Sequence, residues 1–123
     1  MLCQYSFENY KSFKDEALLD FCPDNISEHK GSLIIDKYSS EKFLPVAVLY
    51  GPNGSGKTTV LESLCALFAV VSSYIITLKY PGALQAQGLT PISLADKYHK
   101  FDKKCKSSPT KFNIIFNNCG IDI

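Results

Sequence analysis

The chain has 123 residues, 46% of them hydrophobic, and a formal net charge of +1 at neutral pH. This length suits one domain or part of one, and the balanced charge gives no overall field for or against nucleic acid. The apolar stretch from Leu64 to Leu78 contains hydroxyl side chains and is shorter than the roughly 20 residues that span a bilayer. It is therefore predicted to be a helix buried under a sheet.

The N-terminal residues are predicted to form a hairpin. Cys3, Tyr5 and Phe7 alternate with more polar residues and share one face of a first strand. Residues 8–15 form a polar turn with two aromatic side chains, and residues 16–21 form a second short strand. The two strands are predicted to pair antiparallel.

A strand, a glycine-rich loop and a helix are predicted in the middle of the chain. Residues 43–50 form an apolar, valine-rich run of strand length, and residues 57–71 carry apolar side chains at helical spacing. Between them, residues 51–58 have the sequence GPNGSGKT, which matches the pattern G-x-x-x-x-G-K-[ST] at every position. In this context the pattern predicts a phosphate-binding loop, and a chance glycine-rich turn is the alternative.

The residue types in this loop suit a nucleotide. Glycines at 51, 54 and 56 can take positive φ, so the backbone N–H groups and the dipole of the following helix can surround a phosphate chain. Lys57 reaches the β- and γ-phosphates, Thr58 offers a hydroxyl to Mg²⁺, and Thr59 is placed to hydrogen-bond the α-phosphate. The predicted cofactors are ATP and Mg²⁺, and Lys57 is the predicted catalytic residue. The predicted nucleotide-binding residues of the loop and helix start are Asn53, Gly54, Ser55, Gly56, Lys57, Thr58 and Thr59.

The helix is predicted to continue to about Lys79 and to end at the following Pro81-Gly82. Its inward stripe is predicted to comprise Val60, Leu61, Leu64, Leu67, Phe68 and Val71. The lysine-rich residues 97–106 are predicted to be a solvated face, with DNA contact as the alternative. A last strand is predicted at residues 112–116.

The five cysteines are far apart, and neither histidine lies at metal-ligand spacing from them, so a zinc site is not expected. The odd number of cysteines and the lack of a recognisable signal peptide predict a reducing, cytoplasmic setting.

Residues 7–13 (FENYKSF), the apolar run and the loop YGPNGSGKT together resemble the N-terminal part of ABC-type ATPases. The closest groups are the RecF, SMC and OLD families, and the chain looks most like the prokaryotic RloA and OLD-like AAA ATPases of anti-phage defence systems. The late segment SPTKFNIIF, residues 108–116, resembles their strand after the first helix.

The resemblance implies an α/β P-loop NTPase fold, an ABC-ATPase-like head fragment with a mixed sheet, an N-terminal antiparallel hairpin and a buried helix after the phosphate loop. Residues 1–123 would be the incomplete N-terminal part of such a head, because the acidic hydrolysis motif, signature motif and switch histidine lie far downstream in the family. Asn53 would lie on the γ-phosphate side, facing a partner subunit. Lys11 and Ser12 would lie near the ribose or adenine, and a plain surface lysine is the alternative for Lys11.

The function implied is an ATP-binding and ATP-hydrolysing subunit of a prokaryotic anti-phage defence or DNA-processing complex, active as a complete dimeric head. ATP would be sandwiched between heads of a homodimer or higher oligomer, and head engagement would gate an effector such as a nuclease. Nucleic acid would be a further partner, and no membrane partner is expected. One alternative is a repair or chromosome-maintenance ATPase of the RecF or SMC type. The others are a non-catalytic nucleotide-binding module and a GTPase or small-molecule kinase, although no Asn/Thr-Lys-x-Asp guanine-reading motif is visible.

Overall fold

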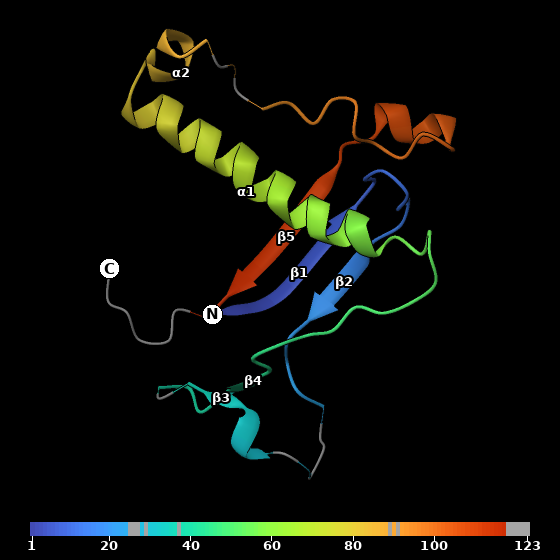
Figure 1. Ribbon diagram of the computed structural model, residues 1–123, viewed down its shortest axis with the longest axis vertical. Helices are drawn as coiled ribbons and strands as arrows, with labels where there is room; N and C mark the ends of the chain where they lie inside the picture. Colours follow the sequence, from blue (N-terminus) through green and yellow to red (C-terminus); the bar gives the residue numbers. More distant parts are fainter. Residues whose placement is uncertain (25–27, 29, 37, 89, 91, 118–123) are drawn as a thin grey trace.

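The computed structural model describes residues 1–24, 28, 30–36, 38–88, 90 and 92–117. Figure 1 shows one long helix lying across a small sheet, with a short two-stranded ribbon beyond one end of that sheet. The elements are β1 (Leu2–Glu8), β2 (Ala17–Asp20), β3 (Ile34–Ile35), β4 (Lys42–Phe43), α1 (Lys57–Lys79), α2 (Ala83–Ala86) and β5 (Lys111–Phe116). Two 3-10 helices cover Lys30–Ser32 and Lys103–Ser107.

The main sheet has the strand order β2-β1-β5, and both neighbours pair antiparallel with β1. Tyr5 lies opposite Leu19 on one side and Ile114 on the other. The predicted N-terminal hairpin and the predicted late strand are therefore confirmed. The prediction of a mixed sheet is wrong for the described part of the chain, because no strand there pairs parallel with another.

The strand predicted before the phosphate loop is also wrong in the described residues. Of the predicted strand at residues 43–50, only Phe43 is in a strand, at the end of β4. Residues 44–50 are not a strand, and Val46, Val48 and Tyr50 are 68%, 78% and 92% exposed. Its valine-rich composition favours a strand, but a strand also needs a neighbour to accept and donate its backbone hydrogen bonds. None of the described strands runs beside it.

The core lies between α1 and the inner face of the sheet. Tyr5, Phe7 and Tyr10 are buried, with Phe7 stacked on Tyr5 and edge-on to Tyr10. The Tyr5 hydroxyl donates to Ser63 Oγ at 2.9 Å, and Ser63 Oγ donates to the Val60 carbonyl at 2.7 Å. Burial of the ring raises the pKa of Tyr5, which keeps the phenol protonated as the donor to the helix.

Helix α1 begins at Lys57 and ends at Lys79, as predicted, but it turns a different face inward. Val60, Leu64 and Leu67 pack on the core, as predicted. The predicted inward residues Leu61, Phe68 and Val71 are 59%, 53% and 45% exposed, whereas Ser63 is fully buried. The helix is apolar on most sides, so spacing alone left its orientation open, and the hydroxyl that pairs with Tyr5 selects the face.

The second half of α1 extends past the sheet, and it leaves Tyr74, Ile75 and Leu78 exposed. At 23 residues, α1 is long and apolar enough to cross a membrane by length and composition alone. Length and composition are weak evidence for a membrane span, because the core helix of a soluble protein passes the same test. The first half of α1 also packs on the sheet. The prediction of a helix buried under a sheet is therefore wrong for much of residues 64–78: one face of the first half of α1 packs on the sheet, and most other positions are exposed.

Candidate functional site

The glycine-rich loop between residues 51 and 56 turns sharply before α1. Gly51, Gly54 and Gly56 have φ values of +154°, +83° and +90°, a region that side chains with a Cβ rarely adopt. The Ser55 N–H donates to the Pro52 carbonyl at 3.2 Å and closes a turn within the loop. The loop is thus curled rather than extended, as an anion-binding loop requires.

The loop leads into a helix start that no side chain caps. Gly56 is the N-cap residue of α1, and no side-chain hydrogen bond caps the helix there. The first turn contains no acidic residue. The first N–H groups of a helix have no partner within the helix, and the helix dipole adds partial positive charge at this end. This helix start therefore offers donors and positive potential to an anion.

The Lys57 ammonium folds back over the loop. Its Nζ donates to the carbonyls of Gly51 and Pro52, both at 2.8 Å, and lies 3.4 Å from Ser55 Oγ. These acceptors are exposed and neutral, so water can replace Lys57 at small cost. The ammonium is held at the loop yet is available to a phosphate, which makes stronger charge-assisted hydrogen bonds.

The turn between β1 and β2 packs directly on this loop. Lys11 Nζ forms an ion pair with Glu62 Oε2 at 2.5 Å, which raises the pKa of Lys11, and Ser12 Oγ donates to Thr59 Oγ1 at 3.3 Å. A Cβ added to Gly56 would lie 2.8 Å from the Phe13 ring. The turn thus contacts the last glycine of the loop and the first two turns of α1.

A buried asparagine holds this turn in place. Asn9 is 2% exposed and has a positive φ of 54°, a conformation that asparagine tolerates better than most residues. Its Nδ2 donates to the carbonyls of Cys105 and Ser108, each at 2.9 Å. Its Oδ1 accepts from the His99 N–H at 3.0 Å, and its carbonyl accepts from Thr110 Oγ1 at 2.8 Å. Sequence reasoning missed this role, although Asn9 opens the Asn-x-x-Ser-Phe pattern.

The predicted site residues come from two segments of the chain that lie next to each other. Those of the loop and helix start adjoin one another along residues 53–59, with Asn53, Gly54, Ser55 and Thr58 exposed. Lys11 and Ser12 lie beside them through Glu62 and Thr59. Lys11 is therefore a surface lysine paired with a carboxylate.

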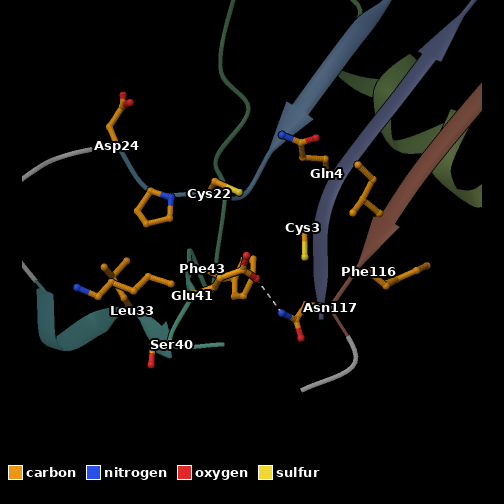
Figure 2. Close-up of a pocket in the computed structure, with 13 residues that line it drawn as sticks. Cys3, Gln4, Cys22, Asp24, Leu33, Ser40, Glu41, Phe43, Phe116 and Asn117 are labelled. Atoms are coloured by element: carbon orange, nitrogen blue, oxygen red, sulfur yellow. Dashed lines mark hydrogen bonds between the residues drawn. The ribbon is translucent and has the colours of Figure 1, made fainter. Parts of the chain in front are cut away.

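A cavity of about 590 Å³ lies beside the loop, between the turn, β2 and α1. Its walls include Ser12, Phe13, Leu49 and Val60. A larger cavity of about 690 Å³ lies where β1 begins, with Cys3, Cys22 and Phe43 in its wall and a hydrogen bond from Asn117 to Glu41 at its edge (Figure 2). Because the loop adjoins the other end of β1, the smaller cavity is the one relevant to this site.

The residues present fit a phosphate chain with Mg²⁺. The donors are backbone N–H groups and one ammonium, the groups that bind phosphate at helix starts. The Thr58 hydroxyl is an oxygen ligand at an exposed position, and Mg²⁺ uses few protein ligands. In the part of the chain that the structure describes, no cluster of three or more His, Cys, Asp or Glu side chains suits another metal.

Replacing Asn9 with alanine is expected to lower the free energy of unfolding by about 2–4 kcal/mol. The change removes the Asn9 amide donor to the Cys105 and Ser108 carbonyls and the acceptor of the His99 N–H, and it places alanine at positive φ. Urea unfolding of the variant measures this decrease. Asn113→Ala, an exposed asparagine of β5, is the matched control, and equal stability of the two variants would contradict the role of Asn9.

Two family models match the chain. Residues 6–75 match a model described as "AAA domain", and residues 46–122 match one described as "AAA domain, putative AbiEii toxin, Type IV TA system". The first match begins within β1 and covers the rest of the hairpin, the loop and most of α1, and both matches contain the loop. No curated protein and no solved structure gives a significant match.

Proposed function

The chain belongs to the AAA domain family, and from this premise we propose that it is the ATP-binding and ATP-hydrolysing part of a prokaryotic defence or DNA-processing complex. Family membership supports a P-loop NTPase fold and a nucleotide-binding ATPase. The observation that carries the proposal is the curled loop with Lys57 over it and an uncapped helix start behind it. Defence is favoured because the second family description refers to a toxin of a type IV TA system.

Each part of the site has a role in this proposal. The N–H groups of Gly54, Ser55 and Gly56 surround the phosphate chain, and Lys57 exchanges its loop carbonyls for the β- and γ-phosphates. When bound, Mg²⁺ neutralises charge on the phosphates, and Thr58 would hold it. Lys57 is the catalytic residue, because its positive charge stabilises the negative charge on the transferred phosphoryl group.

The ribose and base would extend toward the hairpin turn. Ser12 is in the wall of the adjoining cavity and hydrogen-bonds Thr59, the residue proposed to contact the α-phosphate. Lys11 lies next to Ser12 and is oriented by Glu62. These contacts support the placement of Lys11 and Ser12 on the nucleoside side of the phosphate loop.

The active form would be a dimer or higher oligomer of ABC-type heads, with ATP between them and Asn53 facing the neighbouring head. Exposed apolar side chains close to the loop in the sequence support assembly with further protein, because exposed apolar surface commonly marks an interface. They are Val46, Val48 and Tyr50 before the loop and Leu61 on α1. Head engagement would gate an effector such as a nuclease, in the cytoplasm.

A non-catalytic nucleotide-binding module is the second candidate. It is favoured by one observation, that the curled loop, Lys57 and the uncapped helix start are all groups that bind a phosphate chain. In that case nucleotide would bind and hold a complex together without being hydrolysed.

Phosphate release by the complete assembly separates these candidates. We expect release that depends on ATP and Mg²⁺, and a fall to background when Lys57 is replaced by alanine in every head. The matched control is Lys79→Ala, at the far end of α1. ATP binding without phosphate release would favour the non-catalytic module, and release unaffected by Lys57→Ala would contradict the proposed site.

A further inference from the structure

Residues 97–106, here called the basic segment, carry uncompensated positive charge. The segment contains five lysines and a single acidic residue, Asp102. The Asp102 carboxylate is already neutralised by Lys14 at 2.9 Å, from the hairpin turn. All five lysines of the segment are exposed, and none takes part in an ion pair among the described residues. They are Lys97, Lys100, Lys103, Lys104 and Lys106.

An aromatic ring projects into solvent among these lysines. Phe101 is 92% exposed, and its ring centroid lies 5.5 Å from that of His99. A phenyl ring gains free energy when it is removed from water. Phe101 nevertheless stays outside the core, while the neighbouring Cys105 is buried. The segment therefore presents an apolar face flanked by positive charge.

The basic segment is held firmly despite having little regular structure. The Lys11 N–H donates to the Lys97 carbonyl at 2.7 Å, and His99 Nδ1 lies 3.0 Å from the Lys11 carbonyl. The buried Asn9 side chain bonds both the His99 N–H and the Cys105 carbonyl. Since these contacts fix the backbone in advance, a ligand that binds here incurs little of the usual entropic cost of ordering a loop.

We propose that the basic segment is a binding surface for single-stranded nucleic acid. Its lysines match the charge of successive phosphates, whose binding releases counterions. The exposed Phe101 ring, next to His99, provides a surface on which an unpaired base stacks. Bases in a duplex are already stacked on each other, so the exposed ring favours a single strand.

This surface is separate from the phosphate loop. It uses none of residues 51–59 and is assayed without ATP. If the basic segment does not bind nucleic acid, the proposed ATPase function is unaffected. If the chain does not hydrolyse ATP, the proposal for the basic segment is equally unaffected.

Fluorescence anisotropy with a labelled oligothymidine of about 20 nucleotides, longer than the site size of most single-strand binding folds, tests the proposal. The protein is expected to bind it more tightly than a duplex of the same length. Phe101→Ala should weaken binding by about 5- to 150-fold, the range measured when stacking on one base is removed. Phe101→Leu, which keeps an apolar side chain but no ring, should weaken binding to a similar extent.

The lysines are tested through salt dependence. In the double variant Lys103→Ala with Lys104→Ala, the slope of log affinity against log salt should become shallower by about 0.7 for each phosphate that the variant no longer neutralises. Lys42→Ala, an exposed lysine on β4, is the control and should leave the slope unchanged.

Three results would overturn the proposal. The first is no binding of the oligothymidine at low salt. The second is equal affinity for the duplex together with unchanged affinity in both Phe101 variants, which would indicate general attraction to a polyanion. The third is sedimentation with phosphatidylserine vesicles without oligonucleotide binding, which would assign the surface to a membrane. Circular dichroism of each variant confirms that these surface substitutions leave the fold intact.

Discussion

Replacing Lys57 with alanine is expected to lower the affinity for ATP by about 10- to 150-fold. The variant would lose the charge-assisted hydrogen bonding of the ammonium to the β- and γ-phosphates, taken together as a net loss of about 1.5–3 kcal/mol. The fold should be unaffected, because Nζ contacts only exposed acceptors, the carbonyls of Gly51 and Pro52 and the Ser55 hydroxyl, which water can satisfy. Titration with a fluorescent ATP analogue measures the affinity, and a thermal melt checks the fold.

A comparison of nucleotides makes this test specific. AMP lacks the phosphates that Lys57 is proposed to contact, so its affinity should change little, whereas ATP and ADP should both bind more weakly. Lys79→Ala changes a lysine at the opposite end of the same helix and should leave all three affinities unchanged. If the Lys57→Ala variant bound ATP as tightly as the unaltered protein, the loop would be ruled out as the nucleotide site.

The loop and its helix were predictable because their signals are local. Glycines at 51, 54 and 56 mark positions that need positive φ, and all three adopt it. The change from loop to apolar periodicity placed the start of α1 at Lys57, and the Pro-Gly pair placed its end near Lys79. The alternation likewise placed Cys3, Tyr5 and Phe7 on one face of β1, and all three are buried.

The strand before the loop and the face of α1 were not predictable in the same way. Val46 and Val48 have strand propensity, but a strand forms only against a neighbour, and the described residues provide none there. The inward face of α1 depends on Ser63, whose hydroxyl bonds a tyrosine 58 positions away in the sequence. A helix that is apolar on most sides does not reveal such a partner through its own spacing.

The role of Asn9 depends on interactions over still longer separations. It bonds the Cys105 carbonyl 96 positions further along the chain, in a segment with no helical or strand periodicity. The sequence did predict a polar turn at residues 8–15, and residues 7–13 carried part of the family resemblance. The physical meaning of this segment, a turn held by Asn9 that places Phe13 on the phosphate loop, needed the three-dimensional structure.

Replacing Gly56 with alanine is expected to lower the free energy of unfolding by about 2–5 kcal/mol. Gly56 has φ of +90°, where a residue with a Cβ costs about 1–2 kcal/mol. The new Cβ would also lie 2.8 Å from Cε2 and 2.9 Å from Cζ of Phe13. That ring packs edge-on against Phe7, with centroids 5.1 Å apart, so moving it away from Gly56 would disrupt this contact. Such overpacking costs about a further 1–3 kcal/mol.

Gly54→Ala separates the two contributions. Gly54 has a similar φ of +83°, but a Cβ there would have no atom within 4 Å, so this variant carries only the backbone cost. Urea unfolding of both variants gives the cost of the clash with Phe13 as their difference, and in a Phe13→Ala background Gly56→Ala should cost only as much as Gly54→Ala. If Gly56→Ala were as stable as Gly54→Ala, the hairpin turn would not pack on the phosphate loop as closely as the structure shows. The turn would then have no direct mechanical link through which a bound nucleotide could act on Asn9 and the residues that it holds.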